Sequence, residues 1–161
     1  MPQDVSVRRL SPDEWELFRR VRLAALQEAP YAFGSTYASE ASFGEESWRQ
    51  SLADRARFVA EVDGEAAGIV SGGDSGTEGT AAVTTMWVDP MFRRRGVGDA
   101  LLKSVLEWAR SNGYSCLVLW VTEGNEHAEK LYERNAFVRT GKVSLVRAGE
   151  DRIEYEMGRK L

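Results

Sequence analysis

The stretch MWVDPMFRRRGVGDALLKSVLEWARSNGYSCLVLWV, which runs from Met86 to Val121, carries the pattern that decides the fold. Its first residues end a strand at Asp89-Pro90, and three arginines then precede a Gly-Val-Gly turn. An apolar stripe with helical spacing follows from Gly96 to about Asn112. The continuous apolar run at 116–121 is typical of a strand that is buried on both faces. The stretch therefore predicts a strand, a glycine turn, a helix and a second strand.

The glycine turn has the chemistry of an anion-binding site. The first turn of a helix has N–H groups without partners in the helix, and the helix dipole adds partial positive charge there. Glycines let a ligand approach the backbone, and the arginines at 93–95 offer forked donors for phosphate oxygens. Gly98-Asp99-Ala100 does not match a P-loop, and Leu101 occupies the third glycine position of a dinucleotide fingerprint. A solvated basic turn is the alternative.

Composition limits the classes of function. The length of 161 residues predicts one domain over 1–161, and the net charge of −4 argues against a nucleic-acid partner. One cysteine, Cys116, and one histidine, His127, are too few for a zinc site, so we expect no metal. No apolar run reaches the roughly 18 residues of a membrane helix, and the first residues lack a secretion-signal pattern. We expect no membrane partner and a cytoplasmic location.

The rest of the chain adds strands and helices around the quoted stretch. Asp63-Gly64 suits the two-residue turn of a hairpin, and the glycine-rich segment 71–80 is expected to be a mobile loop. No element is predicted for most of 31–44. Together the pattern predicts an α+β fold around one mixed sheet. The expected strands are 5–10, 58–62, 65–70, 81–88, 116–121 and regions near 137–146 and 153–159, and the expected helices begin at a capping box at 11–14 and at about 45, 96 and 126.

Arg93, Gly96 and Gly98 satisfy the pattern Arg-x-x-Gly-x-Gly. This pattern resembles the acyl-CoA pyrophosphate loop of the Gcn5-related N-acetyltransferase (GNAT) superfamily. The quoted stretch is similar to the central strand-loop-helix-strand of that family, and NEHAEKLYERNAFV at 125–138 resembles its next helix. A bacterial-type member is implied. The resemblance implies the GNAT fold, a central mixed sheet of six to seven strands flanked by about four helices, with splayed fourth and fifth strands.

The resemblance implies an acetyl-CoA-dependent N-acetyltransferase, in which an amine attacks the thioester directly. The pantetheine arm would pair with the fourth strand, amides at 94–99 would hold the pyrophosphate, and the thioester would lie between Met86-Trp87 and Leu119-Trp120. The implied residues for binding acetyl-CoA are Met86, Trp87, Val88, Arg93, Arg94, Arg95, Gly96, Val97, Gly98, Asp99, Asn125 and Tyr132.

Tyr132 is the implied catalytic acid, because the resemblance places its hydroxyl near the thioester sulfur. A core tyrosine is the alternative, just as a simple helix N-cap is the alternative for Asn125. The fourth strand lacks the glutamate that many relatives place there. Glu123, just after the fifth strand, is therefore the named candidate for the general base, with glutamates at 40, 45 and 46 as further candidates.

The acceptor is expected to be a small-molecule or peptide amine that binds near residues 31–48. This segment contains five aromatic residues and three glutamates but no lysine or arginine, which predicts an acidic wall for a cationic amine. A hydrophobic cover with a solvated acidic rim is the alternative. A non-catalytic acyl-CoA-binding or sensing module and a nucleotide-binding regulatory domain are the alternative functions. The sequence leaves open whether the protein is a monomer or a homodimer.

Overall fold

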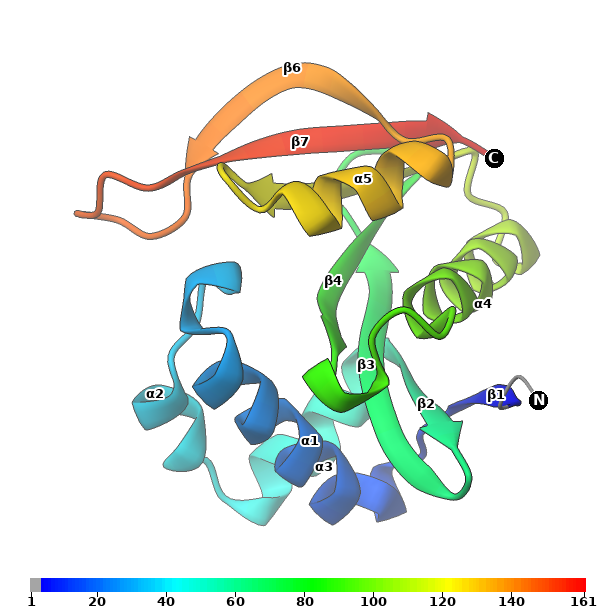
Figure 1. Cartoon of the computed structure of the whole chain (residues 1–161), viewed down its shortest axis with the longest axis vertical. Coiled ribbons are helices and arrows are strands. Elements are labelled where there is room, and N and C mark those ends of the chain that lie inside the picture. The colour runs from blue at the N-terminus through cyan, green and yellow to red at the C-terminus, as the bar shows by residue number, and fades with distance from the viewer. Residues whose placement is uncertain (1–3) are drawn as a thin grey trace.

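A mixed sheet of seven strands runs through the molecule, and the computed structural model describes residues 4–161 of the chain (Figure 1). The strand order is β1-β2-β3-β4-β5-β7-β6, and every neighbouring pair is antiparallel except β4 with β5. This architecture confirms the predicted α+β fold. The strands are β1 (Val5–Arg9), β2 (Ala56–Val62), β3 (Glu65–Asp74), β4 (Thr80–Val88), β5 (Cys116–Thr122), β6 (Val138–Leu145) and β7 (Ile153–Lys160).

Helices cover both faces of the sheet, with α1 to α3 on one side and α4 and α5 on the other (Figure 1). The additional short helix α2 lies in the segment for which no element was predicted. Thr36 caps it, because its side chain accepts a hydrogen bond from the Ser39 N–H at 3.2 Å. The helices are α1 (Trp15–Glu28), α2 (Tyr37–Ala41), α3 (Glu45–Asp54), α4 (Val97–Ser111) and α5 (Glu126–Arg134), with 3-10 helices η1 (Pro12–Glu14), η2 (Pro30–Ala32) and η3 (Pro90–Phe92).

Two hydrophobic cores hold the middle strands from opposite sides. On one side, Leu101 and Leu102 of α4 belong to the same buried cluster as Val70 of β3. On the other side, Phe18 of α1 and Trp48 of α3 make an edge-to-face contact with ring centroids 5.8 Å apart. Burying one such side chain fully contributes about 1.5–3 kcal/mol. Strands β2 to β4 are therefore fixed on both faces and can position polar side chains.

Strands β4 and β5 separate after a short parallel pairing. Their register covers only Thr80–Ala82 and Cys116–Val118, whereas β5 pairs with β7 along its whole length. Within the described residues no strand occupies the space between β4 and β5 beyond this pairing. One edge of β4 therefore has main-chain groups without a strand partner, which confirms the predicted splay of the fourth and fifth strands.

A β-bulge in β4 lies close to the point of separation. Ser71 of β3 pairs with Thr84 and Ile69 pairs with Trp87, so β4 has one more residue than β3 between these pairs. Thr85 lies in the bulge with a φ of 58°, a left-handed conformation that is strained for a β-branched residue. Because a bulge bends its strand, it contributes to the divergence of β4 from β5.

The prediction of a mobile loop at 71–80 was wrong at its beginning. Strand β3 continues through Asp74, and its glycines are buried in the sheet. A Cβ atom added to Gly72 would lie 2.9 Å from the ring of Trp108 of α4, so the residue must be small for the helix to pack there. The glycines of this segment serve close packing rather than a flexible turn.

We expect Gly72→Ala to lower the free energy of unfolding by about 1–3 kcal/mol, because the new methyl group overlaps the Trp108 ring. Gly44→Ser is the control, since Gly44 caps α3 and has nothing within 4 Å of its Cβ position. Serine suits an N-cap, so this change should stay within about 0.5 kcal/mol of wild type. Urea unfolding measures both variants. Equal stability of the two variants would contradict the packing argument.

Candidate active site

The N-terminus of α4 has the geometry of an anion site. Gly96 is its N-cap with a φ of 79°, and a Cβ atom there would meet nothing within 4 Å. The first hydrogen bond of the helix runs from the Ala100 N–H to the Gly96 carbonyl at 3.0 Å. The N–H groups at 97–99 precede that bond and find no carbonyl within the helix. Open space and main-chain donors without partners in the helix ladder therefore meet at the predicted pyrophosphate loop.

The packing around Gly98 requires a residue without a side chain. A Cβ atom on this residue would lie 2.9 Å from Leu131 Cδ2 of α5 and 3.5 Å from Met86 Cε of β4. The start of α4 therefore packs directly against both α5 and β4. A substitution at Gly98 would disturb this packing as well as any ligand.

The carboxylate of Asp99 fastens the start of α4 to the end of α5. It accepts two hydrogen bonds of 3.0 Å from Arg134 and one of 2.9 Å from Asn135. The hydrogen bonds from Arg134 are the main reason why the pKa of Asp99 lies below its usual range. Because Arg134 neutralises this acid, the anion site keeps its positive character.

The three arginines of the turn have different surroundings. Arg93 donates to the Glu28 carboxylate of α1 at 3.1 and 3.2 Å and to the Val88 carbonyl at 3.2 Å. The guanidinium of Arg95 lies 5.6 Å from the ring centroid of Phe92. Arg94 is exposed, and its backbone has a φ of 65°. Arg93 thus already has a carboxylate partner, which the motif alone did not reveal.

The side chains at the end of β4 pack into the two hydrophobic cores. Trp87 is buried against α1, and its indole N–H donates to Glu28 at 2.8 Å. Met86 and Val88 pack against the opposite core. The main chain at 86–88 borders the gap between β4 and β5, where the pantetheine arm of an acyl-CoA is predicted to lie.

Asn125 and Tyr132 lie at the start and near the end of α5, and Tyr132 belongs to the core against which Met86 packs. Asn125 caps the helix, because its side chain accepts a hydrogen bond from the Ala128 N–H at 3.3 Å. The Tyr132 side chain is only 6% exposed and makes an edge contact with Phe137. Burial raises the pKa of Tyr132 far above its usual value. Within the described residues no partner is found for its hydroxyl, which stays protonated near neutral pH.

Glu123 lies exposed at the end of β5, on the side of the sheet that α5 covers. Burial, followed by the charge of Glu123, raises the pKa of Tyr155. The Tyr155 ring lies 4.2 Å from the guanidinium of Arg139, which pairs with Glu129 of α5. The predicted base therefore belongs to a polar group beside α5.

Two glutamates that the sequence analysis did not consider lie on the other face of the sheet. Glu154 and Glu156 of β7 are the register partners of Thr122 and Trp120, so the four side chains share one face. The Thr140 hydroxyl donates to Glu156 at 2.8 Å, and burial raises the pKa of Glu154. The alternation Ile-Glu-Tyr-Glu at 153–156 could have indicated this acidic row.

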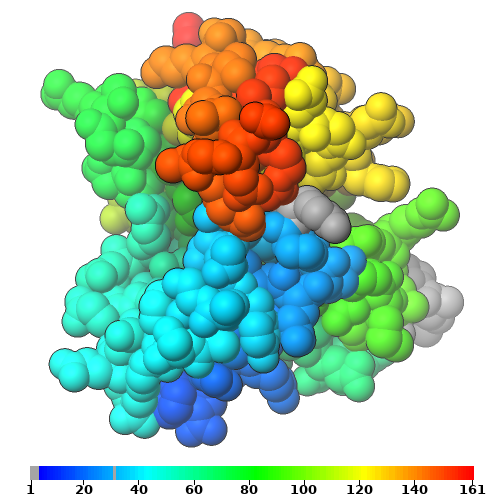
Figure 2. All heavy atoms as spheres, turned by 90° about the vertical axis from the view of Figure 1, so that its left-hand side faces the viewer, coloured from blue at the N-terminus to red at the C-terminus, as the bar shows by residue number. Residues whose placement is uncertain are grey.

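A loop contact bridges the two halves of the molecule on this face. Arg147, in the loop between β6 and β7, donates to the carbonyls of Pro30, Phe33, Gly34 and Ser35 at 3.0–3.3 Å. Figure 2 shows this loop, in orange-red, against the blue and cyan residues of the η2–α2 region. The loop therefore fastens the β6–β7 hairpin to the segment that precedes α2.

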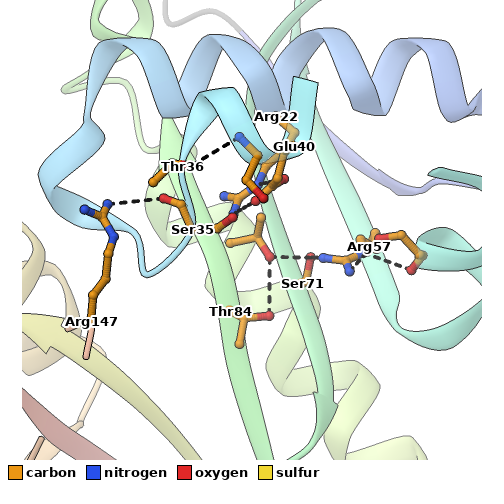
Figure 3. A network of polar contacts seen from close by, with 11 residues as sticks. Arg22, Ser35, Thr36, Glu40, Arg57, Ser71, Thr84 and Arg147 are labelled. Atoms are coloured by element: carbon orange, nitrogen blue, oxygen red, sulfur yellow. Dashed lines mark hydrogen bonds and ion pairs between the residues drawn. The ribbon is translucent and has the colours of Figure 1, made fainter. Parts of the chain in front are cut away.

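Two of the three glutamates in the predicted acidic wall pair with arginines from outside the segment. Glu40 is buried and accepts two hydrogen bonds of 2.9 Å from Arg22 of α1 (Figure 3). Glu45 lies 3.6 Å from Arg49 in an exposed ion pair. The segment itself contains no basic residue, but the fold brings arginines to it from outside. A count of charges along the segment could not show this.

A pocket of about 400 Å³ lies beside Glu40, between the helices α1 to α3 and β4. We call it the arginine pocket. It contains three arginines and one carboxylate among apolar and hydroxyl side chains. Its lining residues are Phe18, Arg22, Glu40, Phe43, Ser47, Trp48, Ser51, Arg55, Arg57, Thr84 and Thr85.

Neither a metal cluster nor a membrane span is found in the described part of the chain. Over residues 4–161, no three His, Cys, Asp or Glu side chains lie together as metal ligands would. The helices in the same range are too short or too polar to cross a bilayer.

Comparison with known proteins agrees with this geometry. The chain is 38% identical over 86 residues to N-acetylaspartate synthetase of Danio rerio, and the aligned region covers 53% of this chain and 30% of that protein. It is 34% identical over 85 residues to an uncharacterized N-acetyltransferase of Methanocaldococcus jannaschii, which is 50% of this chain and 38% of that protein. The chain thus spans about a third of the length of these curated relatives.

Solved structures show the same fold over nearly the whole chain. A ribosomal-protein-alanine N-acetyltransferase from Brucella melitensis has a TM-score of 0.80 at 20% identity and covers 97% of this chain and 99% of its own. An acetyltransferase from Salmonella typhimurium, solved with acetyl-CoA, has a TM-score of 0.78 at 19% identity and covers 98% and 94%. The family model described as Acetyltransferase (GNAT) family matches residues 18–137. With most of its length matched by that model, the chain belongs to the GNAT acetyltransferase family.

Proposed function

We propose that the chain is an acetyl-CoA-dependent N-acetyltransferase in which a primary amine attacks the thioester directly. The observation that carries this proposal is the parallel pairing of β4 with β5, which ends at Ala82 and Val118. The free edge of β4 beyond it lies next to the open start of α4, as the contact between Gly98 and Met86 indicates. Similarity to proteins named N-acetyltransferases, and to a structure solved with acetyl-CoA, supports the proposal.

The residues present fit an acyl-CoA. The amides at 94–99 and the exposed Arg94 would hold the pyrophosphate, while Arg134 cancels the charge of Asp99. The main chain at 86–88 would pair with the pantetheine arm, which Asn125 would contact from α5. Bound acetyl-CoA would supply an activated acetyl group as a thioester. The protein then has to hold and move the protons.

The reaction needs a group that stabilises negative charge on the carbonyl oxygen, an acid and a base, and the chain offers a candidate for each. A main-chain N–H at the free edge of β4 would stabilise the carbonyl oxygen as negative charge develops on it. A bond forms from the amine nitrogen to the carbonyl carbon while the carbon–sulfur bond breaks, and Tyr132 would donate its proton to the sulfur. The amine would lose a proton to Glu154, which lies on the acceptor face. Glu123 is the alternative base.

The rival functions use only part of this arrangement. A non-catalytic acyl-CoA-binding module or a nucleotide-binding regulatory domain needs the anion site at α4. It does not need a second pocket in which an acceptor could reach the thioester. Here the splayed strands lie between that site and the arginine pocket on the opposite face, and the Tyr132 hydroxyl has no partner among the described residues. Release of free CoA thiol in the presence of amines supports the enzyme, whereas CoA binding without release over a broad amine panel supports the module.

A matched pair of substitutions tests the pyrophosphate site. Gly96→Asp places a carboxylate in open space at the start of α4, and Gly96→Asn imposes the same backbone strain without the charge. We expect Gly96→Asp to bind CoA about tenfold or more weakly than Gly96→Asn, because unit charges about 5 Å apart interact by a few kcal/mol at the effective dielectric of a protein surface. Calorimetric titration at low and moderate salt measures this, and equal affinities would place the pyrophosphate elsewhere.

Removing one hydroxyl tests the catalytic acid. Tyr132→Phe should keep CoA affinity but lower kcat by about tenfold or more, since proton transfer by a positioned group contributes typically 10²- to 10⁴-fold. Tyr114→Phe is the control, because its hydroxyl bonds to Asp74 at the opposite end of β4 from the slot. Steady-state assays of thiol release compare the two variants. A kcat for Tyr132→Phe within about twofold of wild type would reduce Tyr132 to a core residue.

The pH profile distinguishes the two candidate bases. A general base works as the carboxylate, and burial raises the pKa of Glu154 above the usual glutamate value of about 4.3. We therefore expect kcat/KM to fall as the pH drops through this raised pKa, because Glu154 then becomes protonated. Glu154→Gln should remove this acidic limb and lower kcat/KM about 10²-fold. Glu123→Gln should retain the limb. The reverse result would assign the base to Glu123.

A further inference from the structure

Resting on the proposed acetyltransferase function, we propose that the acceptor is an amine that also carries a carboxylate, and that the arginine pocket binds this carboxylate. The pocket is formed on the acceptor face of the sheet, away from the pyrophosphate site. Its donor groups come from α1, α3, β2 and β4, and from Arg55 at the end of α3. The amine would then be directed toward the gap between β4 and β5.

The unsatisfied polar atoms of the protein gather in this pocket. Among the described residues, three buried side-chain nitrogen or oxygen atoms have no hydrogen-bond partner, and they belong to Arg22, Trp48 and Arg55. All three residues line the arginine pocket, and all three atoms are donors. Buried donors without partners are rare in folded proteins, because each loses its hydrogen bonds to water. A ligand group that only accepts hydrogen bonds, such as a carboxylate, is the chemical partner that these donors lack.

The positive charge of the pocket is not fully compensated. Arg22 is only 9% exposed and pairs with Glu40. Within the described residues, Arg57 forms no ion pair. It donates hydrogen bonds of 2.8–3.1 Å to the Ser51 carbonyl and to the hydroxyls of Ser51, Ser71 and Thr85. Burial, and next the charge of Arg55, lower the pKa of Arg57 to about 10. A cation that is held by neutral groups in a partly buried site favours an anionic ligand.

The backbone is adapted to the second uncompensated arginine. A Cβ atom on Gly73 would clash with Nη1 of Arg55, so the Arg55 side chain packs against a glycine of β3. A larger residue at this position would displace it. The glycine that was assigned to a loop by sequence thus makes room for a pocket arginine.

Register places this pocket close to the predicted thioester slot. Arg57, Ser71 and Thr84 are partners across β2, β3 and β4, so their side chains form a row on one face (Figure 3). Thr85, which follows, is the bulged residue next to Met86. With about 3.3 Å per residue along a strand, the slot begins roughly 7–10 Å from the row. The carboxylate and the amine of the acceptor should therefore be joined by a short chain.

A substrate panel tests the inference on the unmodified protein. The panel consists of ω-amino carboxylates with one to five methylene groups, their carboxamides, and alkyl amines and diamines of matched length. We expect the carboxylates to exceed the amides and diamines at least tenfold in kcat/KM, with a preferred chain length. Succinate, which has no amine, should inhibit in competition with the acceptor more strongly than succinamide does. The preference should weaken as salt rises, since partly exposed charges are screened.

Substitutions then assign the effect to the pocket. Arg57→Gln and Arg55→Gln should raise KM for the carboxylates about tenfold or more, and leave KM for the amides and the affinity for CoA unchanged. Arg57→Lys should restore part of the loss. Arg49→Gln is the control, because Arg49 is an exposed arginine on α3 that does not line the pocket.

The outcomes separate this inference from the function on which it rests. If CoA binds but no amine in the panel releases thiol, the proposed acetyltransferase function fails. If diamines or amides are the best acceptors, or if succinate and succinamide inhibit equally, the acetyltransferase stands and the carboxylate inference is overturned. A carboxylate preference that survives both pocket substitutions also overturns it.

Discussion

β4 and β5 form parallel hydrogen bonds only over Thr80–Ala82 and Cys116–Val118, and the site is built around their separation. A sheet that opens in its middle leaves main-chain donors and acceptors unpaired, which is unfavourable unless a ligand or water satisfies them. The opening is braced on both faces. On one face Asp99 joins α4 to α5 through Arg134, and on the other Arg147 reaches the η2 segment. These contacts hold the two halves apart at a fixed spacing.

The two faces of the opening present positive groups of different kinds. At the start of α4 they are main-chain amides and exposed arginines, whose geometry follows from helix and turn conformation. In the arginine pocket they are buried guanidinium groups that neighbouring hydroxyls orient. The whole chain has a net charge of −4, so both positive regions are local. Ligands with negative charge at two ends and a reactive centre between them match this distribution.

The elements that depend on local pattern were predictable from the sequence. The strand, glycine turn and helix at 81–112 appear in the structure close to their predicted limits, and the hairpin predicted at 58–70 is present with its second strand extended to Asp74. The predicted splay of the fourth and fifth strands, which rested on the family resemblance, is also observed. The helix α2 was missed because five residues are too few to show periodicity. The start of 71–80 was misassigned because glycine marks close packing in a strand as well as a turn.

The acceptor side could not be predicted in the same way, because its charges come from distant parts of the chain. Arg22 and Glu40 are 18 positions apart in the sequence, and Arg57 and Thr85 are 28 positions apart. Counting glutamates within one segment therefore missed the arginines that pair with Glu40 and Glu45.

A usable signal was nevertheless present in the apolar patterns themselves. Arg22 follows Phe18 by one helical turn on the buried face of α1, and Arg57 lies between the buried Ala56 and Phe58 in β2. An arginine in such a position must be paired inside the protein or be available to a ligand, because an isolated buried charge is costly. Arg22 illustrates the first case, through Glu40. Arg57 has only neutral hydrogen-bond partners among the described residues, and the proposed carboxylate site would make it an example of the second case. A charged residue that interrupts a core pattern therefore indicates an internal polar partner or a ligand, whereas a count of charges along a surface segment omits the partners that come from the rest of the chain.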